Sequence, residues 1–561
     1  MLRTRRRVVP ALLVLALLLT AASGTYLITR EDDPSSEVRA LSDHDDRVAG
    51  LEPCDVPVNL LERVWRGYVP KRSGDVLTIE WDPNQFAGVR HSTPWPYTQD
   101  VPIVLYGPGF IERGLNVKRP VTVADLAPTF AELMNFDAFP ASEREGSSLK
   151  EALLPEEERN GAPKLLFTLV WDGGGDNLLE QWPGAWPNLK QLIAEGVAYE
   201  NATVGSSPSI TPSIHTNIGT GAFPKTHGIT DMAMRVNGKV VPSWAGTSPQ
   251  RLRTQTLGDM WDAAMGNAPL VGMMARDIYH LGMVGYGAYL SGADHDFAVL
   301  ADTESTKSRT NPDYYSMPSY LDDRKGLREA INEVDTRDGQ ADGEWRGFEL
   351  SFNDPYLRYT PVWPIFETPR IVQLLENEGF GTDDVPDLFY MNYKSTDLAG
   401  HRWNLVEPQE RDVLEEQDRQ LPILIDAFNR IAGEGNWVLA LTADHGITPY
   451  PRLTGGWSIE GDDVSADLER RFNKTPEQSS IVIANRGYQI FLDKKELKRQ
   501  GARPEDVSAF LRDYRIEDNV TPTNEIGSSF QNRKKERVFI TALTPGELQE
   551  ALSCARQRQR N

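Results

Sequence analysis

Short runs of consecutive apolar residues alternate along the chain with stretches whose apolar residues recur at helical spacing. The strand-like runs cover residues 101–106, 164–171, 386–393 and 436–442, and the helical patterns include residues 187–195 and 414–428. Continuous apolar strands alternating with helices predict an α/β fold, with a doubly wound, mostly parallel sheet flanked by helices. In such a fold we expect functional residues at the carboxyl ends of the strands.

The first 50 residues have a different pattern. Four arginines within the first seven residues precede a long apolar run that begins at Val8. This pattern predicts that residues 1–30 are an export signal, either a cleaved signal peptide or a retained signal anchor. In both cases the arginines predict that the rest of the chain lies outside the cytoplasm. Residues 31–50 are acidic and poor in large apolar side chains, which is typical of a linker.

Composition narrows the class of protein. The chain has 561 residues, of which 40% are hydrophobic and 25% charged, which excludes global disorder and a membrane protein with many spans. Its formal net charge of −22 would repel nucleic acid polymers, and we expect membrane contact only through the N-terminal segment. The only cysteines, Cys54 and Cys554, allow either one disulfide or two unrelated buried thiols.

Three of the predicted strands lead into residue types that bind metals. Asp172 follows the second strand, Asp397 and His401 follow the third, and Asp444 and His445 follow the fourth. A single aspartate at a strand end usually caps the next helix. Together, aspartates and histidines at neighbouring strand ends can converge on a cation such as zinc.

A threonine stands at a predicted helix start. Thr211 precedes Pro212, and proline is favoured at the first helical position, so Thr211 is expected to be the N-cap. There a nearby metal would lower the pKa of the hydroxyl, and the helix dipole would stabilise an attacking alkoxide or a bound phosphate. The alternative is an ordinary capping threonine.

With these motifs, and with Thr-Gly-x-x-Pro-x-x-His-Gly-Ile at residues 220–229, the chain resembles the alkaline phosphatase superfamily. It is most similar to the type I phosphodiesterase/nucleotide pyrophosphatase branch, from about residue 51 to the C-terminus. The resemblance implies one alkaline-phosphatase-like catalytic domain over residues 51–561, with insertions or a cap at about 235–385. It also implies a phosphoesterase with two zinc ions that acts on a small phosphate ester through Thr211.

The resemblance also assigns the metal ligands. It implies that Asp172, Asp444 and His445 hold one zinc, to which Thr211 also binds, and that Asp397 and His401 hold the other. Mn²⁺ or another divalent ion would also suit these ligand types. It implies structural roles for the two further histidines of the nucleophile segment, His215 and His227.

One zinc ligand of the family is missing from its usual place, because no histidine follows His445. The family's C-terminal block instead resembles residues 51–155, and residues 160–561 resemble the remainder, so the chain is predicted to be circularly permuted. His91 in that block is then the last zinc ligand. His44 lies in the linker, and His280 and His295 lie in the insertion region.

The permutation has a consequence for the cysteines. In the unpermuted order the C-terminal helix that carries Cys554 would lead directly into Cys54. The resemblance therefore implies a disulfide between the two.

The preferred substrate stays open at this point. The phosphodiesterase branch has an asparagine shortly after His-Gly-Ile, where this chain has Met232. We therefore expect the donor to be another residue, Asn217 or Asn237, or to be absent. Arg276, beside Asp277, falls where monoesterase relatives place charged substrate contacts, or forms a solvated ion pair. We expect hydrolysis of phosphodiesters or nucleotide pyrophosphates through a phosphothreonine; the alternatives are a phosphomonoesterase and an inactive surface binding protein.

Overall fold

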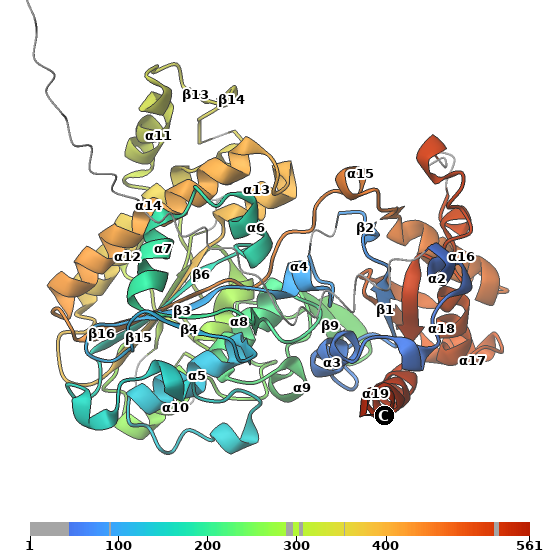
Figure 1. Ribbon diagram of the computed structural model, residues 1–561, viewed down its shortest axis with the longest axis horizontal. Helices are drawn as coiled ribbons and strands as arrows, with labels where there is room; N and C mark the ends of the chain where they lie inside the picture. The colour runs from blue at the N-terminus through green and yellow to red at the C-terminus, as the bar shows by residue number, and fades with distance from the viewer. Residues whose placement is uncertain are drawn as a thin grey trace, which may run out of the picture.

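The computed structural model describes residues 44–88, 91–287, 295–301, 307–352, 354–520 and 527–560, which form a larger and a smaller lobe (Figure 1). The predicted export signal and most of the predicted linker lie outside the described residues. Among the described helices, none combines the length and the apolar character needed to cross a membrane.

The larger lobe is built on an eight-stranded sheet. In spatial order its strands are β12 (Phe297–Leu300), β11 (Val271–Ala275), β15 (Asp387–Tyr393), β6 (Leu165–Trp171), β16 (Trp437–Thr442), β3 (Ile103–Tyr106), β7 (Val197–Tyr199) and β4 (Leu115–Val117). The first five strands are mutually parallel, and β3 runs antiparallel to both of its neighbours. The four apolar runs identified in the sequence are β3, β6, β15 and β16, which confirms those strands.

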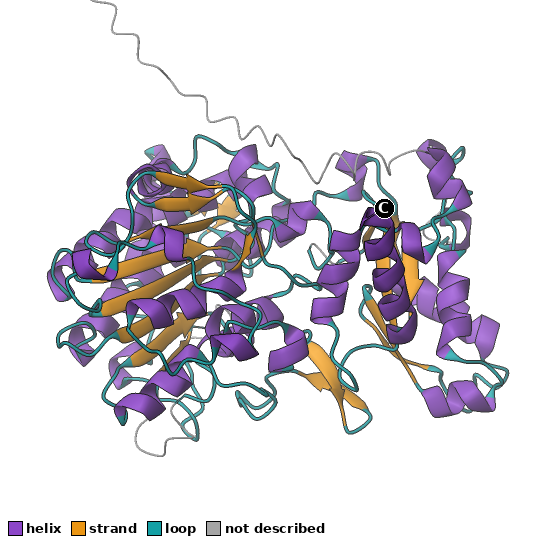
Figure 2. Cartoon of the chain, turned by 60° about the horizontal axis from the view of Figure 1, so that its bottom comes forward, coloured by secondary structure: helices purple, strands orange, loops and turns teal. Residues whose placement is uncertain are grey.

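Helices cover both faces of this sheet (Figure 2). Successive side chains of β6 point to opposite faces, so that Leu166 and Phe167 belong to two different hydrophobic cores. One core includes α5 (Leu126–Leu133), α8 (Thr211–Thr220) and α10 (Leu257–Met265); the other includes α6 (Asp176–Gln181), α7 (Pro187–Glu195), α12 (Val362–Glu378) and α14 (Pro408–Ile431). The prediction of a doubly wound, mostly parallel sheet is confirmed.

Part of the range 235–385 belongs to this core. The elements β11, β12, α10 and α12 all lie there, whereas α11 (Leu327–Asp335), β13 (Glu344–Trp345) and β14 (Phe348–Glu349) form a separate cluster at the periphery (Figure 1). The hairpin of β9 (Ala233–Val236) and β10 (Lys239–Pro242) lies at the start of this range. Only a fraction of the expected insertion is therefore peripheral.

The smaller lobe contains an antiparallel sheet that the sequence pattern did not reveal. Its strands, in spatial order, are β18 (Val482–Asn485), β19 (Gln489–Leu492), β1 (Val76–Glu80) and β20 (Phe539–Leu543). Helices α16 (Gly461–Phe472), α17 (Lys494–Arg499) and α18 (Pro504–Arg512) contribute to one core, and α3 (Val58–Gly67) and α19 (Pro545–Arg560) contribute to another. Two lobes with separate cores therefore share residues 51–560.

The other helices and strands of the described residues are short. They are α2 (His44–Ala49), β2 (Gln85–Phe86), α4 (Pro96–Gln99), β5 (Val121–Thr122), β8 (Ala202–Thr203), α9 (Pro224–His227), α13 (Ser395–Trp403), α15 (Pro451–Thr454) and β17 (Ser458–Ile459).

The two ends of the described chain meet in the smaller lobe. Strand β1 pairs with β20, and α3 packs against α19. Cys54 and Cys554 are joined by a disulfide, with their Cα atoms 5.5 Å apart across a sequence separation of 500 residues. The implied disulfide is confirmed. This proximity of the ends is what a circular permutation requires, and the permutation itself stays a prediction.

Replacing both cysteines in a Cys54→Ser/Cys554→Ser variant should lower the free energy of unfolding. Because the bridge restricts the unfolded chain, the chain-entropy argument allows a loss of up to about 5 kcal/mol. Thermal unfolding of the variant and of the wild-type protein measures the difference. A reductant should lower the midpoint of the wild type and leave that of the variant unchanged. Alkylation of two free thiols in denatured, unreduced wild-type protein would contradict the bridge.

Candidate active site

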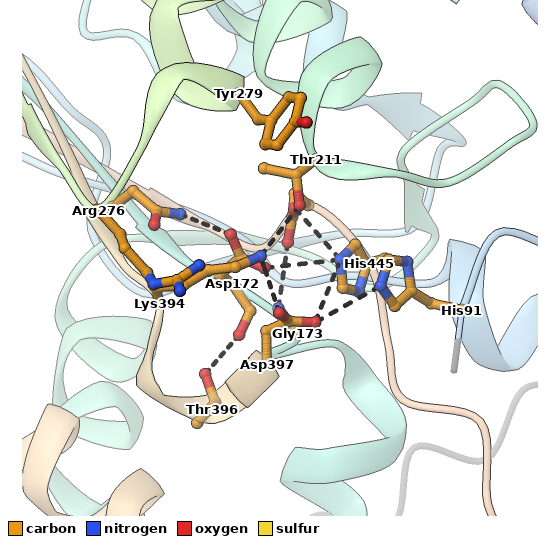
Figure 3. A network of polar contacts seen from close by, with 12 residues as sticks. His91, Asp172, Gly173, Thr211, Arg276, Tyr279, Lys394, Thr396, Asp397 and His445 are labelled. Carbon is orange, nitrogen blue, oxygen red and sulfur yellow. Dashed lines mark hydrogen bonds and ion pairs between the residues drawn. The ribbon is translucent and has the colours of Figure 1, made fainter. Parts of the chain in front are cut away.

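The candidate site lies at the carboxyl ends of the central parallel strands, as expected for this fold (Figure 3). Asp172 directly follows β6, and Asp397 lies in α13, just after β15. Asp444 and His445 come after β16. Neighbouring parallel strands end at the same edge of the sheet, so residues far apart in sequence meet there.

Asp172, Asp444 and His445, here called the first triad, are fully buried. His445 Nε2 lies 3.5 Å from Asp172 Oδ1 and 3.3 Å from Asp444 Oδ2. Within the described part of the chain, Asp444 Oδ2 and His445 Nε2 have no hydrogen-bond partner. Burial, together with the neighbouring Asp172 carboxylate, raises the pKa of Asp444 to about 6. A buried oxygen and a buried nitrogen that lie this close together without a hydrogen bond fit a divalent cation.

His91, Asp397 and His401 form the second triad. Asp397 Oδ1 lies 3.5 Å from His91 Nε2 and 3.2 Å from His401 Nε2. Asp397 and His401 are four residues apart on α13, which places them on one face of the helix. His91 Nδ1 forms a hydrogen bond of 2.9 Å with the carbonyl of Ser209, which turns Nε2 toward Asp397.

The two triads are in direct contact. The rings of His91 and His445 stack with their centroids 3.6 Å apart. Burial, and secondarily the nearby His445 ring, hold the pKa of His91 well below its usual range, so the ring is in the neutral form that binds metals. The structure thus brings together the six aspartate and histidine side chains that the resemblance implied as ligands; their metal-binding roles stay predictions.

The prediction that Thr211 is the N-cap is wrong: Thr211 is the first residue of α8, so the helix begins one residue earlier than predicted. Ile210 occupies the N-cap, and no side chain caps the helix. The Thr211 hydroxyl is therefore not used for capping. Its Oγ1 accepts a hydrogen bond of 3.1 Å from Lys394 Nζ. Pro212 occupies the first turn, and Gly221 ends the helix in the left-handed conformation.

Lys394 is a member of the site that the sequence patterns missed. It directly follows β15, and its Nζ lies 2.7 Å from Asp172 Oδ1 and 2.8 Å from Asp397 Oδ2 (Figure 3). Burial alone would lower the pKa of this amine, but Asp172 and Asp397 outweigh it and raise the pKa above its usual value. The same ammonium group holds the pKa of Asp172 well below its usual range, against the effect of burial.

His280 and Asn392 hold the other oxygen of Asp172. His280 lies in the 3₁₀ helix η6 (Ile278–Met283), with Nε2 3.3 Å from Asp172 Oδ2, and Asn392 Nδ2 donates to the same oxygen at 3.0 Å. Burial opposes protonation of His280, but Asp277 and Asp172 raise its pKa to about 9. The expectation that His280 lies in an insertion away from the ligands is therefore wrong.

The nitrogens of His215 and His227 already have protein partners. His215 Nδ1 forms a hydrogen bond of 2.9 Å with the carbonyl of Thr211, and its Nε2 lies 3.0 Å from Asn392 Nδ2. His227 Nε2 lies 2.9 Å from Asn217 Oδ1. His215 is near enough to Asp172 and His280 to share a metal, but this hydrogen bonding agrees with the structural role implied for it.

The three candidate substrate contacts have different positions. Asn217 is fully buried in α8 beside His227, and Asn237 is exposed in the turn between β9 and β10, with a φ of 50°. Among the described residues, no hydrogen bond joins either amide to a triad residue, and the role of replacement donor stays a prediction. Arg276 follows β11 and lies at the edge of the site (Figure 3), with its Nη1 3.1 Å from Asp277 Oδ2. The side chain of Arg276 is 17% exposed, so its ion pair with Asp277 is largely buried. This differs from the solvated ion pair that was one of the two expectations.

A pocket of about 430 Å³ adjoins the second triad and extends toward the smaller lobe. His91, His401 and Met232 are among the lining residues nearest the triads, and Arg486 and Tyr488 are among those of the smaller lobe. Met232, at the family's asparagine position, therefore faces this pocket without an amide.

The site consists of a threonine at a helix N-terminus beside two clusters of aspartate and histidine. This arrangement defines a metal-dependent hydrolase that acts on phosphoric ester bonds. The profile of the family described as type I phosphodiesterase / nucleotide pyrophosphatase matches residues 166–537. The chain belongs to this family and so to the alkaline phosphatase superfamily.

Known relatives agree with that assignment. The chain is 22% identical over 409 residues to alkaline phosphatase PafA of Elizabethkingia meningoseptica. The matched region covers 63% of this chain and 72% of PafA. It is also 22% identical over 408 residues to alkaline phosphatase PhoV of Synechococcus elongatus, with the same coverage of 63% and 72%. The crystal structure of wild-type PafA superposes with a TM-score of 0.51 at 19% identity, covering 68% of this chain and 84% of PafA.

His91→Ala should lower metal occupancy and activity together, because it removes one of the three predicted ligands of the second triad. Metal content is measured by mass spectrometry after dialysis. His295→Ala, outside both triads, should retain the wild-type metal content. His280 is unsuitable as a control because it contacts Asp172. An unchanged zinc stoichiometry in His91→Ala would show that another residue completes this site.

Proposed function

We propose that this chain hydrolyses phosphodiesters or nucleotide pyrophosphates, with Thr211 as the nucleophile. The observation that carries the proposal is the position of Thr211 Oγ1. It lies at the positive end of α8, does not cap the helix, and shares Lys394 as a neighbour with both triads. A phosphoryl group bound there would meet the backbone N–H groups of the first helical turn.

In the proposed reaction, Thr211 Oγ1 forms a bond to phosphorus as the bond from phosphorus to the leaving-group oxygen breaks. The proton lost from the hydroxyl is balanced by the proton that the leaving oxygen takes up from solvent. The products of this step are a phosphothreonine that keeps the second substituent on phosphorus, and an alcohol from a diester or a phosphate from a pyrophosphate. Water then cleaves the phosphothreonine, which returns a proton to Thr211 and releases the phosphate monoester.

The two triads would each hold one divalent cation, which we propose to be Zn²⁺. Bound there, the cations would supply positive charge that lowers the pKa of the Thr211 hydroxyl and neutralises the phosphoryl oxygens. The mixed imidazole and carboxylate ligands favour zinc, and Mn²⁺ accepts the same types. Two of the proposed ligands are oriented by a neighbouring residue. The Ser209 carbonyl fixes the ring of His91, and His280 fixes the carboxylate of Asp172.

The pocket beside the second triad supports a diester substrate. Its volume of about 430 Å³ is in the range of small-molecule sites, and it offers room for a second substituent on phosphorus. A phosphomonoesterase is the alternative, supported by Arg276 at the site edge and by the names of the alkaline phosphatase relatives.

We further propose that the protein is exported. The basic and apolar pattern of residues 1–30 supports export, and the disulfide supports an oxidising compartment. Mass spectrometry of N-terminal peptides from membrane and extracytoplasmic fractions would locate the chain and show whether the segment is cleaved. Recovery in the cytoplasm with free thiols would refute export.

Thr211→Ala should lower turnover by at least about 10³-fold while both metals stay bound, because only the nucleophilic oxygen is lost. Thr211→Ser, which keeps a hydroxyl group, is the matched control and should retain activity. Hydrolysis of bis(4-nitrophenyl) phosphate and of 4-nitrophenyl phosphate is measured with zinc and with manganese. A fully active Thr211→Ala enzyme would rule out the nucleophile, and a higher kcat/KM for the monoester would favour the alternative.

A further inference from the structure

Lys394 places a buried ammonium group between the nucleophile and both triads. An ammonium group has three N–H bonds to donate. The three oxygen atoms within reach are Asp172 Oδ1 at 2.7 Å, Asp397 Oδ2 at 2.8 Å and Thr211 Oγ1 at 3.1 Å. Figure 3 shows the amine aimed at this junction. All three N–H bonds can therefore be used, and one of them acts on the reacting oxygen.

The rest of the site fixes this amine in place. Lys394 directly follows β15, a strand buried along its whole length in the middle of the parallel sheet. The carboxylates that hold it belong to the neighbouring strand end and to the first turn of α13. Asp172 is itself held by His280 and Asn392. A cation fixed in this way needs little reorganisation when charge develops beside it.

A purely structural lysine would only need to neutralise the buried carboxylates. The contact with Thr211 goes beyond that requirement. When the hydroxyl oxygen becomes a nucleophile and carries negative charge, a hydrogen bond from an ammonium group becomes charge-assisted and therefore stronger. The interaction is thus more favourable during attack than in the resting enzyme, which is the condition for lowering a barrier.

We propose that Lys394 is a catalytic residue that holds Thr211 Oγ1 and stabilises the negative charge on it during attack on phosphorus. This inference rests on the proposed function. In the attack step the bond from Oγ1 to phosphorus forms and the bond to the leaving group breaks, as described above. Lys394 stays an ammonium group throughout and neither gives nor takes a proton, so the proton balance of the reaction is unchanged.

The test compares Lys394→Met with Lys394→Arg in the full-length, metal-loaded protein. Methionine keeps much of the apolar stem and removes the charge, so kcat should fall about 10²–10³-fold with a smaller change in KM. Arginine restores a cation with a different shape, so kcat of Lys394→Arg should be roughly tenfold higher than kcat of Lys394→Met. The control is Lys164→Met, since Lys164 pairs with Asp384 at 3.1 Å next to β6 and should leave kcat unchanged.

Two readouts separate catalysis from structure. Metal content by mass spectrometry should be the same in Lys394→Met and wild type. The affinity for orthovanadate, measured by calorimetry, should be lower in Lys394→Met, because vanadate mimics the phosphoryl group under attack by Oγ1.

Several results would overturn the proposal. Lys394→Met with both metals bound and kcat within about threefold of wild type would show that the amine is not catalytic. Joint loss of metals and activity, without recovery in Lys394→Arg, would show a structural lysine instead. If wild-type protein hydrolyses no phosphate ester, the proposed function fails as well; an active wild type with an active Lys394→Met refutes only the role of the lysine.

Discussion

The Asp172 carboxylate is the contact on which the arrangement of the site depends. One of its oxygens faces Lys394 and His445, and the other is held by His280 and Asn392. A buried carboxylate is stable only when its hydrogen-bonding capacity is met. The groups that meet it come from β15, η6 and the end of β16. The site is therefore complete only when these elements of the larger lobe are in place.

Four strands of the larger lobe, β3, β6, β15 and β16, could be predicted from the sequence, because each is a largely apolar run. The residues after β6, β15 and β16 were predicted as metal ligands for the same reason: a strand ending in aspartate or histidine is visible locally. His91 was found only through the resemblance of its segment to a block of the family. Its position beside Asp397 depends on the fold, and periodicity does not reveal it.

Other features depend on contacts that no local pattern encodes. Lys394 and His280 look like ordinary polar residues until the sheet brings them to Asp172. The sheet of the smaller lobe pairs β1 with β20, which are separated by more than 450 residues, and its strands are short. Asn217 and Asn237 were chosen by residue type, but the first is committed to His227 and the second to a turn. The surrounding packing decides which polar side chains reach the site.

The disulfide of the smaller lobe makes the chain a covalent ring from Cys54 to Cys554. A protease that cuts one peptide bond anywhere within this ring opens it but releases no fragment, because both pieces remain linked through sulfur. Peripheral loops such as the segment around α11 could therefore be nicked without loss of either lobe. This ring would therefore give the protein tolerance to proteolysis in addition to stability.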